Sequence, residues 1–103
     1  MTRGEVWWAR LPKPVGRRPV LLLSRASAYA VRSAVTVAPL TQTIRDIPVE
    51  VPLGPEDGLP RRCVVNLDDV ATIPKGLIAE RITSLSHEKM EAVETALRFA
   101  LDL

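Results

Sequence analysis

Short apolar runs, separated by stretches rich in proline and glycine, make up most of this chain. Runs of this kind are typical of β-strands joined by turns. They predict strands at residues 4–10, about 18–24, 34–40, 47–53, 63–67, 70–73 and 77–85. Proline cannot donate a hydrogen bond to a ladder, so the two prolines within residues 47–53 predict an edge strand. The polar connection at residues 27–33 has room for one helical turn.

The period of the pattern changes from that of a strand to that of a helix near the end of the chain. Ser86 is a good N-cap, and Met90, Val93, Leu97 and Leu101 fall on one helical stripe, which we expect to face the core. Many short strands followed by one helix predict a mainly β fold, a small β-barrel with a C-terminal helix. A chain of 103 residues fits a single domain, residues 1–103.

The stretch at residues 16–24 combines two arginines, a proline and a buried-strand pattern. Arg17 and Arg18 directly precede Pro19, which we expect at the first residue or the edge of a strand. Two guanidinium groups held by a rigid strand suit a phosphate. The alternative is that both arginines are ordinary solvated loop charges.

Charge is distributed unevenly along the chain. Residues 1–45 contain eight basic residues and one acidic residue, a net charge of +7, whereas residues 63–103 carry a net charge of −3. Eleven of the fourteen cations are arginine, which binds phosphate and stacks on bases. This asymmetry favours a polyanionic partner, and a basic protein without a nucleic-acid role is the alternative.

The sulfur and imidazole groups are too few for several common kinds of site. The single cysteine, Cys63, excludes an internal disulfide, fits a reducing cytoplasm and is read as a small buried hydrophobe. With one histidine besides, no usual clustered metal site is expected, and no cofactor. The polar residues 1–5 indicate no secretion signal, and no run of eighteen apolar residues predicts a membrane span.

Two adjacent tryptophans lie in the first predicted strand. Trp7 and Trp8 should point to opposite faces, because strand side chains alternate. One is expected in the core, and the other either packs as well or lies on the surface, where an indole can stack on a base.

Several stretches in the right order resemble one family, the MazF/PemK/Kid toxins of type II toxin–antitoxin pairs. The similar segments are RGEVW at 3–7, RRPVL at 17–21, TVAPLT at 36–41, VNLDDVATI at 65–73 and KMEAVETAL at 89–97. Together they extend over nearly the whole chain.

This resemblance implies an SH3-like barrel of the PemK/CcdB type, a cytoplasmic homodimer, and a toxin that inhibits translation and growth. The implied activity is sequence-specific, metal-independent cleavage of single-stranded RNA that leaves a 2′,3′-cyclic phosphate and a 5′-hydroxyl. Arg18 falls on the family's catalytic arginine, and Thr41 falls on its catalytic threonine. The implied partner is an antitoxin with an acidic, partly disordered segment.

The chain departs from the family pattern at two places where RNA should enter. The loop at residues 12–17 is shorter than usual, and Ser24-Arg25-Ala26 replaces the family's polar pattern after the second strand. Arg25 therefore either contacts a phosphate or is a solvated charge. The residues predicted to contact RNA are Arg17, Arg25, Gln42, Thr43 and Arg45.

Two other functions compete with the nuclease. A gyrase poison of the CcdB type has the same fold, but it depends on a C-terminal tryptophan and isoleucine, and this chain ends Ala-Leu-Asp-Leu. A non-catalytic SH3-like module would bind single-stranded RNA with strong salt dependence and leave it intact.

Overall fold

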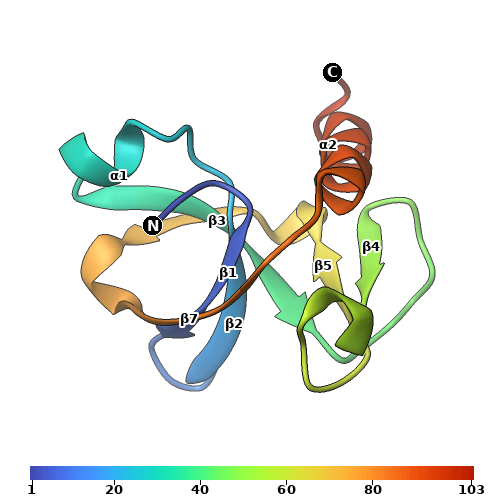
Figure 1. Cartoon of the computed structure of the whole chain (residues 1–103), viewed down its shortest axis with the longest axis horizontal. Coiled ribbons are helices and arrows are strands. Elements are labelled where there is room, and N and C mark those ends of the chain that lie inside the picture. The colour runs from blue at the N-terminus through green and yellow to red at the C-terminus, as the bar shows by residue number, and fades with distance from the viewer.

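A computed structural model describes residues 1–103 and contains seven strands and two α-helices (Figure 1). The elements are β1 Glu5–Arg10, β2 Arg17–Leu22, α1 Ala28–Val31, β3 Ala34–Thr41, β4 Glu50–Leu53, β5 Cys63–Asn66, β6 Ala71–Pro74, β7 Ile78–Ser84 and α2 His87–Leu101. Every predicted strand is present, with ends shifted by up to three residues, and the helical turn is α1. Neither helix combines the length and the apolar character needed to cross a membrane.

All strand pairs are antiparallel, and the strand order along the sheet is β4-β5-β3-β2-β1-β7, with β6 paired to β3. The bent sheet is barrel-like, but β4 and β7 are not paired, so the barrel remains open. Strand β3 pairs with β6 through Ala34–Val37 and then with β5 through Leu40 and Thr41. The edge position predicted for residues 47–53 is confirmed for β4.

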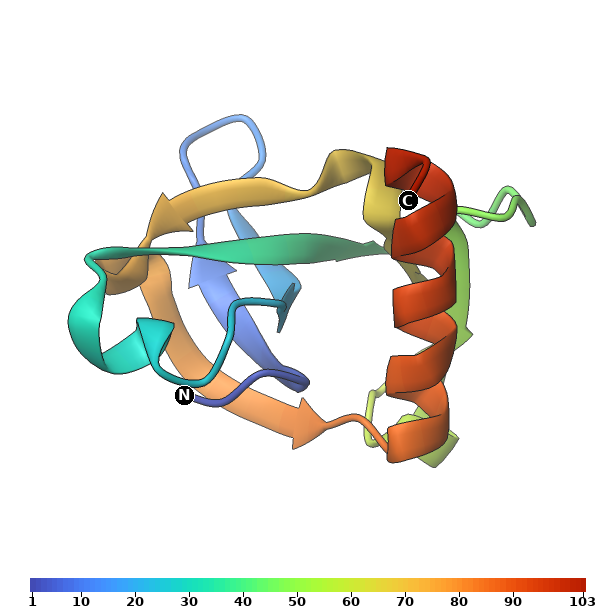
Figure 2. The same ribbon diagram turned by 90° about the horizontal axis from the view of Figure 1, so that it is seen from above.

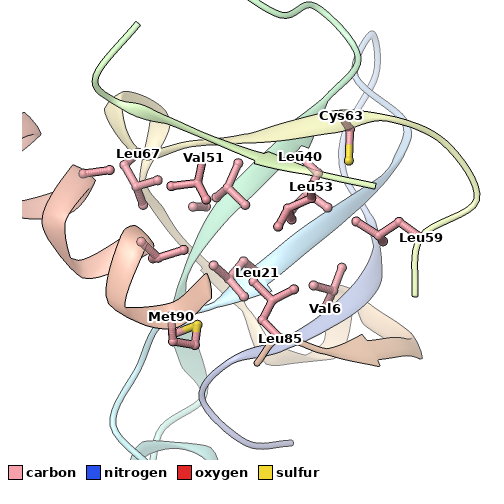
Figure 3. Close-up of a cluster of buried hydrophobic side chains, with 14 residues drawn as sticks. Val6, Leu21, Leu40, Val51, Leu53, Leu59, Cys63, Leu67, Leu85 and Met90 are labelled. Carbon is pink, nitrogen blue, oxygen red and sulfur yellow. The ribbon is translucent and has the colours of Figure 1, made fainter. Parts of the chain in front are cut away.

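The core consists of two clusters of buried side chains, on the two faces of the central strands. The larger cluster joins β-strand residues such as Val6 and Leu21 to Met90 and Val93 of α2 (Figure 3). The smaller cluster contains Val20, Leu22 and Tyr29, among others, and lies at the α1 side of the sheet. Consecutive residues of β2 therefore enter different clusters, as the alternation of strand side chains requires.

Helix α2 packs along one end of the sheet, opposite α1 (Figure 2). The Ser86 side chain accepts a hydrogen bond from the Lys89 backbone, which confirms the predicted N-cap. Met90 and Val93 are buried and Leu97 packs against the larger cluster, but Leu101 is 57% exposed. The prediction for Leu101 was wrong because the helix continues past the apolar surface that it covers.

The position expected for Pro19 was also wrong. Pro19 is the third residue of β2, a strand with partners on both sides. At Pro19 only the β1 side is paired, with Trp8, because the ladder to β3 begins one residue later at Val20. The missing N–H therefore interrupts no bond to β3.

Candidate active site

The candidate site lies where β2 and β3 stop pairing. Their ladder runs from Leu22 to Val20, which is opposite Pro39. If the ladder continued in the same register for two more residues, Arg18 would lie opposite Thr41. Beyond Pro39, however, β3 has no partner on its β2 side and pairs only with β5 on its other edge, and the start of β2 and the end of β3 diverge (Figure 1). The opening between them is a cavity that no backbone ladder fills.

This cavity has a volume of about 450 Å³, and both sides of the opening contribute to its wall. Arg17, Arg18 and Pro19 come from β2, whereas Thr41, Gln42 and Thr43 come from β3 and the following loop. The remaining lining residues are Trp8, Leu40, Leu59, Pro60, Arg61, Cys63 and Ile82. Five of the seven residues predicted for the site are thus brought together.

Arg18 is half-buried in the wall, opposite Ala9 of β1. None of the ion pairs in the molecule involves its guanidinium group. No acidic residue lines the cavity, while Arg17 and Arg61 add two further positive charges. A partly desolvated guanidinium without a carboxylate partner is a strong donor for a phosphate oxygen.

The Thr41 hydroxyl is oriented by the turn that follows β3. Its Oγ1 accepts a hydrogen bond from the Thr43 backbone N–H at 3.2 Å. A hydroxyl oxygen that accepts this bond still has its own proton, which it can donate. Thr41 therefore supplies a neutral donor from the β3 side of the cavity, whereas Arg17 and Arg18 come from the β2 side.

A stacked pair forms one side of the cavity. The Arg17 guanidinium carbon lies 4.2 Å from the centre of the Trp8 ring. Nη2 of the same guanidinium forms an ion pair with Oε2 of Glu80 at 3.9 Å. Trp7, on the opposite face of β1, packs against the smaller core cluster and donates its indole N–H to Glu5. Trp7 and Trp8 lie on opposite faces of β1, as the alternation predicts, and the stack of Arg17 on Trp8 is a planar surface on which a base can stack.

Sequence reasoning missed the contribution of the turn before β5. Leu59, Pro60, Arg61 and Cys63 line the cavity because β5 pairs with the end of β3, where Thr41 is opposite Val64. The Arg61-Arg62 pair was the available signal, but its proximity to Thr41 depends on a pairing that no local pattern reveals.

Cys63 is buried, as the sequence predicted, and forms part of the cavity wall. Burial raises the pKa of its thiol, and the nearby charge of Asp57 raises it further. The thiol is therefore neutral near pH 7 and serves as apolar wall, since the thiolate is the reactive form. Nowhere in the chain do three or more histidine, cysteine, aspartate or glutamate side chains gather as metal ligands would.

Two predicted RNA contacts lie outside the cavity. Arg25 lines a separate, smaller pocket beyond the other end of β2. Arg45 is exposed in the loop after Thr43, and it is not part of the cavity wall. The structure does not bring these two arginines together with Arg18 and Thr41.

A buried carboxylate holds the loop that follows Thr43. Oε1 of Glu50 accepts the backbone N–H groups of Arg45 and Asp46, at 2.9 and 3.1 Å, while Oε2 is buried without a partner. Asp46 adopts a left-handed φ of 56°, which closes the turn back toward β4. Glu50 thus fixes the path of the loop whose first residues line the cavity.

Glu50→Ala is expected to lower the free energy of unfolding by about 2 kcal/mol, because the backbone N–H groups of Arg45 and Asp46 lose a charged acceptor. Glu50→Gln keeps an acceptor oxygen and removes the buried charge, so its cost should be under about 1 kcal/mol. Denaturant unfolding gives both values, and hydrogen exchange at Arg45 and Asp46 locates the change. The exposed Glu56→Ala is the control, and equal exchange at these amides in all variants would contradict this role of Glu50.

Comparison with known proteins identifies the family. Residues 2–101 match the family described as PemK-like, MazF-like toxin of type II toxin–antitoxin system. The chain is 44% identical over 101 residues to a probable endoribonuclease, MazF5, of Mycobacterium tuberculosis. This alignment covers 97% of this chain and 92% of that protein. It is 37% identical over 86 residues to endoribonuclease MazF3 of the same species, covering 84% of each.

Solved structures agree with these sequence relatives. M. tuberculosis toxin MazF-mt6 matches 96% of this chain and 97% of its own, with a TM-score of 0.89 and 34% identity. A mycobacterial endoribonuclease in complex with its cognate antitoxin matches 100% of this chain and 96% of its own, with a TM-score of 0.88 and 30% identity. The chain belongs to the family of PemK-like, MazF-like toxins of type II toxin–antitoxin systems.

Proposed function

We propose that this protein is a toxin endoribonuclease that cleaves single-stranded RNA without a metal ion and thereby inhibits translation and growth. The observation that carries the proposal is that Arg18 and Thr41 line one cavity that contains no acidic residue. The relatives named endoribonuclease support the same reaction. The expected products are a 2′,3′-cyclic phosphate and a 5′-hydroxyl.

In this reaction the ribose 2′-oxygen forms a bond to the adjacent phosphorus and loses its proton to solvent, while the bond from phosphorus to the 5′-oxygen breaks and the 5′-oxygen takes a proton from solvent. The pentacoordinate phosphorane carries more negative charge on its oxygens than the phosphodiester does, so fixed donors stabilise it selectively. Arg18 binds these oxygens through its guanidinium, and Thr41 donates one further hydrogen bond. Neither group is a good base at neutral pH, so the rate acceleration derives mainly from positioning and electrostatics.

The rest of the cavity is proposed to hold the neighbouring nucleotides. Arg61 attracts a flanking phosphate, and the planar stack of Arg17 on Trp8 offers both a positive charge and a stacking surface for one base. Gln42 and Thr43 supply polar groups that can read base edges. The exposed Arg45 extends this contact along the loop.

The assembly is proposed to be that of its relatives. We expect a cytoplasmic homodimer, each chain a single endoribonuclease domain of residues 1–103, inhibited by a cognate antitoxin. A mycobacterial neighbour solved with its cognate antitoxin supports this partner. An acidic, partly disordered antitoxin segment would compete with RNA for the arginines. The family match gives no support to the gyrase-poison alternative.

The purified protein should cleave a long RNA in the presence of EDTA, and mapping of the new ends should find a 5′-hydroxyl at each site. Thr41→Val should lower the single-turnover rate by about 10- to 100-fold, the effect of one hydrogen bond to a charged group. Thr41→Ser retains the donor and should keep most of the rate. RNA that stays intact at several sequences but binds with strong salt dependence would identify a non-catalytic module instead.

A further inference from the structure

A second, smaller pocket lies at the opposite end of β2 and β3 from the cavity. It has a volume of about 130 Å³ and is lined by Ser24, Arg25, Ala28, Arg32, Ala34, Thr36 and Thr72. Its residues come from the end of β2, helix α1, the start of β3 and strand β6, which pairs with β3 at Thr36 and Thr72. None of them belongs to the site described above.

The charge of this pocket is uncompensated. Arg25 and Arg32 both line it, both are exposed, and no carboxylate lies within ion-pair distance of either. No acidic residue contributes to its wall. Two guanidinium groups at one small pocket therefore present unused N–H donors to the same space.

The hydroxyl groups of the pocket are also arranged as donors. Ser24 Oγ accepts the Thr36 backbone N–H at 2.8 Å, and its own proton can be donated either to the neighbouring Tyr29 hydroxyl or to a ligand. The Thr36 and Thr72 hydroxyls are 3.2 Å apart and share one hydrogen bond, so one of their two protons is free as well. Donors from two arginines and these hydroxyls thus outnumber the available acceptors, which favours an oxyanion as ligand.

The size of the pocket limits the ligand. A volume of about 130 Å³ corresponds to roughly four water molecules at about 30 Å³ each. Pockets for drug-sized molecules start at about 300 Å³, so this pocket is too small to enclose a ligand of that size. A single tetrahedral oxyanion does fit and can accept hydrogen bonds in several directions.

We propose that this pocket binds one phosphate group, held by Arg25 and Arg32 and by the Ser24 and Thr36–Thr72 hydroxyls. The phosphate can be inorganic phosphate or a phosphate of an RNA chain, which offer the pocket the same oxygens. Arg25 then contacts phosphate at a place distinct from the scissile bond. The inference does not rest on RNA cleavage, because phosphate binding is measured without any reaction.

Titration with sodium phosphate, against sodium chloride at equal ionic strength, tests the site directly. NMR signals of the Arg25 and Arg32 side-chain N–H groups and of the Thr36 amide should shift and saturate. Arg25→Gln/Arg32→Gln should weaken phosphate binding at least about tenfold, the effect of losing charge-assisted hydrogen bonds. Arg10→Gln/Arg98→Gln removes two other exposed arginines and should leave the binding unchanged.

A second arm distinguishes the source of the phosphate. RNA with 2′-O-methyl groups cannot be cleaved, so its affinity can be measured for the intact protein. If an RNA phosphate occupies the pocket, Arg25→Gln/Arg32→Gln reduces RNA affinity more than the control pair does. The slope of log affinity against log salt then falls by about 0.7 for one lost phosphate contact. A loss no larger than that of the control pair assigns the pocket to free phosphate.

Absence of saturable shifts at Arg25, Arg32 and Thr36 in phosphate would overturn the proposal. Equal phosphate binding by the folded double variant and the wild-type protein would overturn it too. Thermal melts of both double variants establish that they are folded. If the wild-type protein does not cleave RNA, the proposed nuclease activity is refuted, but the result of the phosphate titration is unaffected.

Discussion

Arg18→Ala is expected to lower the single-turnover rate of RNA cleavage by about 10²- to 10³-fold. Removal of one fixed donor from a transition-state oxyanion typically has an effect of this size. Arg18 has no ion-pair partner in the protein, so its loss leaves no buried carboxylate behind and should hardly affect folding. The rate is measured on a short RNA at saturating enzyme.

Two further variants separate charge from geometry. Arg18→Lys keeps the positive charge but loses the planar fork, so it should restore only part of the rate. Arg98→Ala removes an exposed arginine of α2 and should leave the rate within about twofold of wild type. An Arg18→Ala protein that cleaves as fast as the Arg98→Ala protein would rule out the proposed catalytic role.

Leu21→Ala is expected to reduce the free energy of unfolding by about 3–5 kcal/mol. Leu21 is fully buried in the larger core cluster, and the truncated side chain leaves a cavity that rigid neighbours cannot fill (Figure 3). For a chain of this size, each kcal/mol corresponds to about 4–8 °C in melting temperature. The variant should therefore melt more than about 10 °C below wild type, as calorimetry can show.

The matched control is Leu101→Ala, which makes the same chemical change on the exposed end of α2. Because Leu101 is 57% exposed, its truncation should change the free energy of unfolding by no more than about 0.5 kcal/mol. If Leu21→Ala and Leu101→Ala lower the free energy of unfolding by similar amounts, the C-terminal end of α2 is covered, for example by a second copy of the chain.

Local patterns predicted the elements well but not the contacts between them. The apolar run around Leu21, which predicted a buried strand, and the stripe from Met90 to Leu97 are short-range signals, and both predictions are confirmed. Leu101 continues the same stripe, yet periodicity contains no information on where the underlying sheet ends. Pro19 was misplaced because the point at which β3 joins β2 is set by long-range register.

The same limit applies to the candidate site. Arg18 and Thr41 were identified through a family resemblance, and the register of β2 and β3 explains their proximity. Arg25 is only seven residues from Arg18, but an extended chain covers about 23 Å over that distance. The opposite holds for Arg61. It is distant from Arg18 in the sequence, but the pairing of β5 with β3 brings it to the same cavity.

The change of partner along β3 divides the proposed catalytic pair between two structural units. Arg18 is attached to the unit of β1, β2 and β7, whereas Thr41 is attached to β4 and β5, and Pro39 lies at the seam. Grafting residues 40–66 from a relative onto this chain would therefore exchange one half of the cleft while the arginine stays native. Chimeras cut at Pro39 offer a route to new RNA preferences in a protein that keeps its own Arg17 and Arg18.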